Sequence, residues 1–186
     1  MKKLFNITLL LSLLLAPLSA NAQATVENIY EIALMQYQNH NYTKAVENFQ
    51  KAAASGHVKA IYSLGCCFQD GTGVIKDEAM ALQMFTEAAN AGYDKAQSTL
   101  GDAYAWKRLG IKKKDYQEAV RWYALAGQQG NANALYQLGR CYEAGRGVKK
   151  DKKMAAAYYQ KAVEAGNPYA SEYLNKILSK HPEYAY

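Results

Sequence analysis

Residues 134–170 read ALYQLGRCYEAGRGVKKDKKMAAAYYQKAVEAGNPYA, and the same pattern occurs twice more upstream. Residues 60–96 read AIYSLGCCFQDGTGVIKDEAMALQMFTEAANAGYDKA, and residues 96–134 read AQSTLGDAYAWKRLGIKKKDYQEAVRWYALAGQQGNANA. The alanines at positions 60, 96, 134 and 170 are separated by 36, 38 and 36 residues, and Leu-Gly pairs and aspartates share this register. A fixed period of this length predicts an array of structural repeats.

Each repeat is predicted to contain two amphipathic helices joined by a turn. Apolar residues recur three or four positions apart over residues 134–142 and again over 155–162, while Gly145 and Gly147 interrupt the pattern between them. One helix pair cannot bury its apolar stripes alone, so the pairs must stack on one another. We expect the small residue Gly139 to let a neighbouring backbone approach closely.

The repeats resemble the Sel1-like repeat, a relative of the tetratricopeptide repeat. The shared pattern is Ala-x-x-x-Leu-Gly-x-x-Tyr/Phe-x-x-Gly-x-Gly-Val, then Lys-Asp, then Ala-x-x-x-Tyr/Phe-x-x-Ala and a closing Ala-x-x-Gly. The resemblance is strong over 59–92 and 133–166. It is looser over 95–130, where AWKRLG at 105–110 replaces the Gly-x-Gly turn and the loop is two residues longer. The resemblance implies an all-α, right-handed α-solenoid of stacked antiparallel helix pairs. It says little about function, because repeat scaffolds take varied partners.

Residues 1–22, MKKLFNITLLLSLLLAPLSANA, predict a secretory signal peptide. A basic start precedes an apolar run that ends at Leu18, and small residues flank the predicted cleavage site after Ala22. The apolar run is shorter than the roughly 20 residues that a membrane-spanning helix needs, which disfavours a membrane anchor. We therefore expect the mature chain to be periplasmic or secreted.

Residues 23–186 are predicted to form a single solenoid domain. We expect a short leader at 23–28 and a first repeat more like a tetratricopeptide unit, because terminal repeats of such arrays are atypical. The tail should be loose, since Pro182 stops the preceding helix. The predicted units are repeats at about 28–57, 58–94, 95–131 and 132–168, an end helix at 169–180 and the tail at 181–186.

Charge is unevenly distributed along the chain, which carries a net charge of +6. Residues 23–94 contain four basic and eight acidic residues, whereas residues 95–186 contain sixteen basic and eight acidic residues. Much of the excess lies in two inter-helix loops, which we expect to share one edge of the solenoid. This basic edge comprises Lys107, Arg108, Lys112, Lys113, Lys114, Arg146, Lys149 and Lys150. It either binds an acidic protein, anionic lipid or envelope polymer, or it is a solvated edge that maintains solubility. The export signal and the acidic first half disfavour nucleic acid.

The three cysteines do not predict a structural disulfide. Cys67 and Cys141 occupy the same repeat position two repeats apart, beyond the roughly 7 Å between Cα atoms that a disulfide allows. Cys66 and Cys67 are adjacent, so a bridge between them would be strained. Cysteine-rich secreted members of the resembled family carry a helix-to-helix cysteine pair in each repeat, which this chain lacks. An exposed Cys66 would still be able to pair with another chain.

Catalysis has to be weighed, because the resemblance includes secreted proteins that bind or hydrolyse β-lactams. Serine enzymes of that kind use Ser-x-x-Lys, and no serine after residue 22 has a lysine three positions on. His40, His57 and His181 have no metal-ligand spacing with another histidine or cysteine. The Gly-x-Gly turns follow no strand, which disfavours a phosphate-binding loop. We predict no catalytic residue, no cofactor and no metal site.

The first helix of each repeat is expected to line the concave surface of the solenoid. Its apolar positions are nearly constant, while the positions beside them vary from copy to copy, as a binding surface requires. The candidate partner-binding residues are Lys59, Tyr62, Ser63, Cys66, Gln69, Ser98, Asp102, Trp106, Tyr136, Gln137, Arg140 and Glu143. Tyrosine, tryptophan and arginine are the residue types that most often anchor interfaces. Packing of Trp106 under the longer loop of its own repeat is an equal alternative.

The predicted function is non-catalytic protein recognition by an exported, monomeric scaffold. Such a scaffold would regulate a partner or neutralise a toxin as an immunity protein. Two alternatives stay open. One is a secreted enzyme that acts on β-lactams or peptidoglycan. The other is a peripheral protein that binds anionic envelope surfaces through the basic edge.

Overall fold

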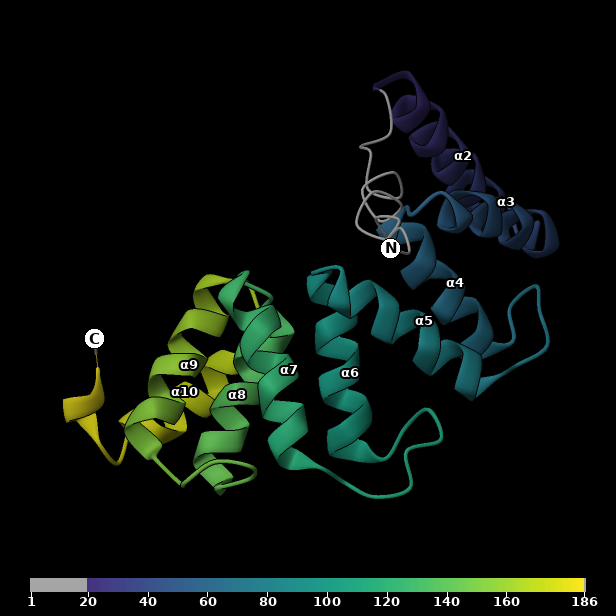
Figure 1. The fold of residues 1–186 in the computed structure, drawn as a ribbon. Coiled ribbons are helices and arrows are strands. Elements are labelled where there is room, and N and C mark those ends of the chain that lie inside the picture. The colour runs from purple at the N-terminus through teal and green to yellow at the C-terminus, as the bar shows by residue number, and fades with distance from the viewer. Residues whose placement is uncertain (1–19, 186) are drawn as a thin grey trace, which may run out of the picture.

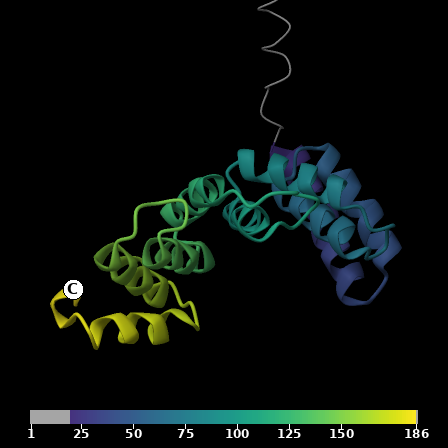
Figure 2. The ribbon, with the colours of Figure 1, turned by 90° about the horizontal axis from the view of Figure 1, so that it is seen from below.

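The computed structural model describes residues 20–185, which form a stack of helices without strands. The helices are α2 (Ala20–Gln38), α3 (Tyr42–Ala54), α4 (Val58–Asp70), α5 (Glu78–Asn90), α6 (Asp94–Trp106), α7 (Tyr116–Gln128), α8 (Ala132–Ala144), α9 (Lys152–Glu164), α10 (Ala170–Leu178) and the short 3₁₀ helix η1 (Pro182–Tyr184). Each helix packs on the next one along the chain (Figure 1). The pairs follow an arc from α2 to α10 (Figure 2). This architecture confirms the predicted α-solenoid.

The two ends of the solenoid differ from the prediction. Residues 23–28 are not a separate leader, because they belong to α2 and Val26 is buried against the first repeat. The tail is not loose either, since η1 packs against α9 and α10 and Tyr184 stacks on His181. Apart from its last three residues, which begin α2, the predicted signal peptide lies outside the described residues.

In each Sel1-like repeat, a glycine of the first helix lies under an aromatic ring of the second helix. A Cβ atom added to Gly139 would lie 2.6 Å from ring carbons of Tyr159, which is fully buried. The equivalent pairs are Gly65 with Phe85 and Gly101 with Tyr123. The missing side chain of this recurring glycine therefore leaves room for an aromatic ring of the same repeat. Our expectation of a close backbone approach at Gly139 was wrong.

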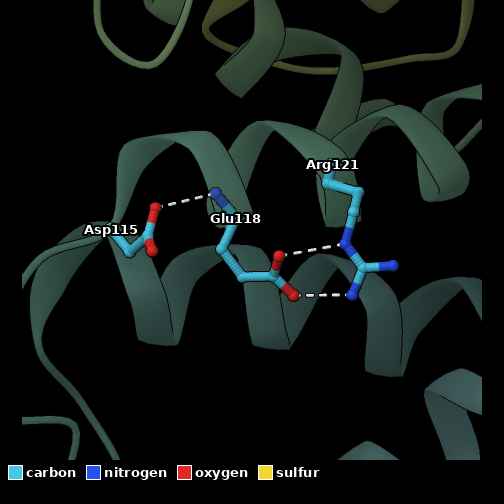
Figure 3. Close-up of polar contacts among 3 residues, drawn as sticks. All are labelled: Asp115, Glu118 and Arg121. Carbon is cyan, nitrogen blue, oxygen red and sulfur yellow. Dashed lines mark hydrogen bonds and ion pairs between the residues drawn. The ribbon is translucent and has the colours of Figure 1, made fainter.

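The recurring aspartates cap the second helices. The carboxylates of Asp77, Asp115 and Asp151 accept hydrogen bonds from backbone N–H groups in the first turns of α5, α7 and α9. In α7, Asp115 accepts from the N–H of Glu118 at 2.9 Å, and the Glu118 carboxylate accepts two hydrogen bonds from Arg121 (Figure 3). An N-cap side chain satisfies a donor that the helix itself leaves unpaired, so these aspartates define where each second helix begins.

The second glycine of the Gly-x-Gly turn makes a contact between repeats. Gly147 has a φ of 72°, and a Cβ atom there would collide with the backbone carbonyl of Tyr116 in the preceding repeat. Gly73 has the same relation to the backbone of Tyr42. The longer loop between α6 and α7 lacks this turn and instead buries Leu109, whose φ is 56°. The longer loop therefore changes the connection between α6 and α7, while the two helices still pack on each other.

Substituting Gly139→Ala should test the ring contact. The added methyl group would press on Tyr159 from a rigid helix, and overpacking of this kind destabilises proteins by about 1–3 kcal/mol. Urea denaturation gives the free energy of unfolding. Gly127→Ala in α7 is the matched control, because its Cβ atom would meet only leucine side-chain carbons at 3.2 Å or more. An equal loss in both variants would contradict the assignment.

Substituting Asp115→Ala should lower the free energy of unfolding by about 1 kcal/mol, because the first turn of α7 loses its cap. Asn41 precedes α3 at the corresponding place but makes no side-chain cap hydrogen bond. Asn41→Ala should therefore change stability by less than about 0.5 kcal/mol. Urea denaturation of both variants measures the difference, and comparable losses would argue against a capping role.

Candidate functional site

Surface depressions open between successive first helices along one face of the solenoid. We call this face the first-helix face, and it is formed by α2, α4, α6 and α8. The depression between α2 and α4 is mainly apolar and is lined by Leu34, Tyr37, Phe49, Ser63 and Cys66. The depression between α4 and α6 is more polar, and its lining includes Tyr62, Gln69, Thr99, Asp102 and Arg108. The depression between α6 and α8 is lined in part by Trp106, Tyr116, Gln137, Arg140 and Arg146.

Most of the candidate partner-binding residues lie at these junctions, but two are buried. Tyr136 is only 8% exposed, because its ring packs against the rings of Tyr169 and Tyr173 at the end of the solenoid. Ser98 is 5% exposed and accepts a hydrogen bond from Asn133. The expectation that Tyr136 and Ser98 point outward was therefore wrong. Lys59 is exposed, and the half-buried candidates are Tyr62, Ser63, Cys66, Gln69, Asp102, Trp106, Gln137, Arg140 and Glu143.

Asp102 links three helices. Its carboxylate accepts a hydrogen bond from the Tyr123 hydroxyl of α7 at 2.7 Å and another from the Gln137 amide of α8 at 3.3 Å. Burial raises the pKa of Asp102, and the Tyr123 hydrogen bond and the charges of Arg108 and Arg140 offset only part of that rise. The same arrangement recurs one repeat later, where Glu143 accepts a hydrogen bond from the Tyr159 hydroxyl at 2.8 Å. Two candidate residues on the first helices thus also satisfy buried tyrosine hydroxyls.

Trp106 lies between the loop of its own repeat and the next repeat. Lys114 of its own loop lies 5.6 Å from the indole centroid. Arg140 of α8 lies 5.5 Å from that centroid, and Arg146 lies 5.9 Å from it. These are cation–π distances. The two alternatives for Trp106 therefore combine, because its ring contacts its own loop and also lines the depression between α6 and α8.

The two loops of the basic edge approach each other at Tyr116. Lys114 of the α6–α7 loop and Arg146 of the α8–α9 loop lie 5.9 Å and 5.6 Å from its ring centroid. Both loops lie along the lower margin of the view in Figure 1. The other basic-edge residues, Lys107, Arg108, Lys112, Lys113, Lys149 and Lys150, are exposed.

Sequence reasoning missed the aromatic residue at the start of the second helix. Tyr116 directly follows the capping aspartate, and Tyr42 occupies the same place in the first repeat. The shared position of the two tyrosines could have been noticed in the sequence. The structure shows the reason for it, because a glycine of the following repeat packs against the backbone of each tyrosine.

The cysteines occupy packed positions. Cys67 and Cys141 are buried, Cys66 is half-buried, and all three are free thiols. Burial raises the pKa of Cys67 and of Cys141 to about 11, so both are protonated at neutral pH. Over residues 20–185, no grouping of three or more His, Cys, Asp or Glu side chains suits a metal ion. Within the same range, every helix is too short or too polar to cross a bilayer.

Comparison with known proteins finds the same repeat throughout the chain. Residues 34–57, 58–93, 95–131 and 132–167 each match the sequence model of the family described as Sel1 repeat. Among curated proteins, the rat DAP3-binding cell death enhancer 1 is 30% identical over 177 residues. That match covers 75% of this chain but 34% of the rat protein. The chain thus spans about a third of this relative's length.

Two solved bacterial structures share the fold. A protective antigen of uropathogenic Escherichia coli, which displays an SLR fold, superposes with a TM-score of 0.78 at 32% identity, covering 84% of this chain and 34% of that chain. A Sel1 repeat protein from Oxalobacter formigenes superposes with a TM-score of 0.77 at 32% identity, covering 89% of this chain and 67% of that chain. Both are arrays of the same helix pair.

The raised pKa of Asp102 leads to a pH-dependent prediction. A carboxyl group with a higher pKa in the folded state binds more protons when folded, so its contribution to stability falls as the pH rises through the folded-state pKa. Asp102→Asn keeps an oxygen that can accept from Tyr123 and Gln137 but never ionises. We expect this variant to unfold at higher urea concentration than the wild type at pH 7, and the gain should shrink towards pH 4.

The exposed Asp70→Asn substitution changes the net charge equally and serves as the control. A similar gain in stability in Asp70→Asn would show that the change in net charge, and not the burial of Asp102, causes the effect. A loss of stability in Asp102→Asn at pH 7 would contradict the inference that burial disfavours the ionised form of Asp102.

Proposed function

The chain belongs to the Sel1 repeat family, and on that basis we propose that it is an exported, non-catalytic scaffold that recognises a protein partner. The observation that carries this proposal is the row of depressions between successive first helices. Their frame of alanine, leucine and glycine is nearly constant, while their linings change from apolar to polar to cationic. A row of depressions whose lining residues differ, on helices that pack in the same way, suits recognition of one extended partner.

The comparisons support binding more than chemistry. The rat relative is named as a binding protein, and the family consists of repeat scaffolds on which partners vary. Regulation of an envelope protein and neutralisation of a toxin as an immunity protein are both compatible with such a scaffold. Export rests on the residues 1–22 pattern, and the monomeric state rests on the sequence prediction alone.

The enzyme alternative finds little support in the first-helix face. Cys66 lines the depression between α4 and α6, and Cys141 lines the depression between α6 and α8. Burial raises the pKa of both thiols, which disfavours the reactive thiolate. The half-buried carboxylates Asp102 and Glu143 already accept hydrogen bonds from tyrosine hydroxyls. Failure to hydrolyse nitrocefin or peptidoglycan would agree with the proposal.

Affinity capture from an envelope extract, read by mass spectrometry, tests the scaffold. We expect one protein to be enriched by the wild-type chain and lost with the double variant Gln69→Lys, Arg140→Glu, which alters two depressions of the first-helix face. A charge reversal at an interface typically costs enough binding energy to abolish capture.

The matched control is Gln83→Lys, Lys161→Glu, which makes the same charge changes at exposed positions of the second helices α5 and α9. Capture that survives the first double variant and fails with the second would place the partner on the other face. Capture lost instead on reversing Lys112, Lys113, Lys149 and Lys150, and replaced by salt-sensitive vesicle binding, would favour the basic-edge alternative.

A further inference from the structure

Three cations converge on two aromatic rings at the junction between α6 and α8. We call this group, which consists of Trp106, Tyr116, Lys114, Arg140 and Arg146, the Trp106 cluster. Each of the three cations lies within 6 Å of the Trp106 ring centroid. Lys114 and Arg146 also lie within 6 Å of the Tyr116 ring. The cluster borders a surface depression to which Gln137 adds an amide.

Among the described residues, the cations of the cluster lack a close ion-pair partner. Within residues 20–185, no carboxylate lies within 4 Å of a nitrogen of Lys114, Arg140 or Arg146. Asp102 accepts a hydrogen bond from Tyr123 and still interacts with the charge of Arg140, while Glu143 accepts a hydrogen bond from Tyr159. Because all three cations lie within 6 Å of the same ring, an anion that approaches this ring would be stabilised by their combined charge.

The cations of the Trp106 cluster are not a general feature of the repeats. The corresponding positions at the junction between α4 and α6 hold two basic and three acidic residues. There Lys76 pairs with Glu78 at 3.5 Å, and Asp102 faces the charge of Arg108. The corresponding residues, in the order Trp106, Lys114, Tyr116, Arg140 and Arg146, are Asp70, Lys76, Glu78, Asp102 and Arg108. The same five positions thus change from nearly balanced charge to three unpaired cations in one step along the solenoid.

We propose that the Trp106 cluster is a binding site for an acidic side chain, aspartate or glutamate, of an extended protein segment. This inference rests on the proposed function and names the partner chemistry at one junction. Guanidinium groups bind carboxylates through paired hydrogen bonds, and two arginines face the same depression. The aromatic rings offer apolar faces to the methylene groups of the same side chain.

The geometry favours a peptide over an anionic lipid surface. A flat surface contacts side chains that protrude, whereas Arg140 is half-buried on α8 and Trp106 is half-buried at the end of α6. Arg140 and Arg146 also lie beside the Trp106 ring and line a depression between two helices. The depression has a volume of about 10 Å³, so the acidic side chain of an extended segment would lie across its mouth, beside the two guanidinium groups.

Titration with a blocked hexa-glutamate peptide at low ionic strength tests the site. The second tryptophan, Trp122, is 5% exposed, so a saturable change in tryptophan fluorescence reports mainly on Trp106. We expect a dissociation constant below about 1 mM by calorimetry and no binding of hexa-glutamine. Arg146→Gln removes one charged donor and should weaken binding about tenfold. Arg146 is exposed, so this substitution leaves the fold intact.

Lys149→Gln is the matched control, because it removes one positive charge from the same loop at an exposed position away from the rings. In the same titration we expect it to weaken hexa-glutamate binding clearly less than Arg146→Gln does, and to leave binding within twofold of the wild type once salt is raised for all three proteins. Absence of saturable hexa-glutamate binding, or equal weakening by Lys149→Gln and Arg146→Gln, would overturn the proposal. Arg146-dependent binding of phosphatidylglycerol vesicles without peptide binding would also overturn it, in favour of a lipid surface.

The two proposals fail separately. A partner captured equally by the wild type and by Arg146→Gln would leave the scaffold standing and remove the acidic-segment site from its interface. Specific hexa-glutamate binding with no captured protein would keep the site and argue against the scaffold.

Discussion

The contact between a glycine and an aromatic ring is the constraint on which the three repeats from α4 to α9 depend. Tyr159 is fully buried because Gly139 has no side chain where the ring lies. A larger residue on the first helix would push the second helix outward, and every later helix pair is positioned through the pair before it. The buried ring also sets a polar requirement, because the Tyr159 hydroxyl must find an acceptor, which Glu143 provides on the first helix.

Connections between repeats depend on backbone contacts of a different kind. Aspartates cap the first turns of α5, α7 and α9. The first residues of α3 and α7, Tyr42 and Tyr116, receive the Gly-x-Gly turn of the following repeat. Gly147 can lie against Tyr116 only because it has no Cβ atom and has a positive φ. The loop between α6 and α7 lacks the Gly-x-Gly turn, and its Lys114 lies beside the Trp106 ring.

The residues that hold each helix pair together are largely distinct from the first-helix positions that vary between repeats. Alanine, leucine, glycine and the buried ring hold each pair together, while the neighbouring positions of the first helix change without disturbing them. Asp102 shows that the separation is incomplete, since its carboxylate faces a surface depression and also satisfies Tyr123. The burial that raises its pKa is a cost of holding that hydroxyl in place. At the next junction Arg140 takes the same position, and the local charge becomes positive.

The sequence by itself determined the repeat period, the helix pairs, the register of the aspartates and the turns, because these follow from interactions between residues close together in the chain. It also identified most of the residues along the first-helix face. Only the tertiary structure decided that Tyr136 and Ser98 are buried, since their covering residues come from neighbouring helices. It alone brought Lys114, Arg140 and Arg146 around Trp106, because that convergence depends on how one repeat is stacked on the next.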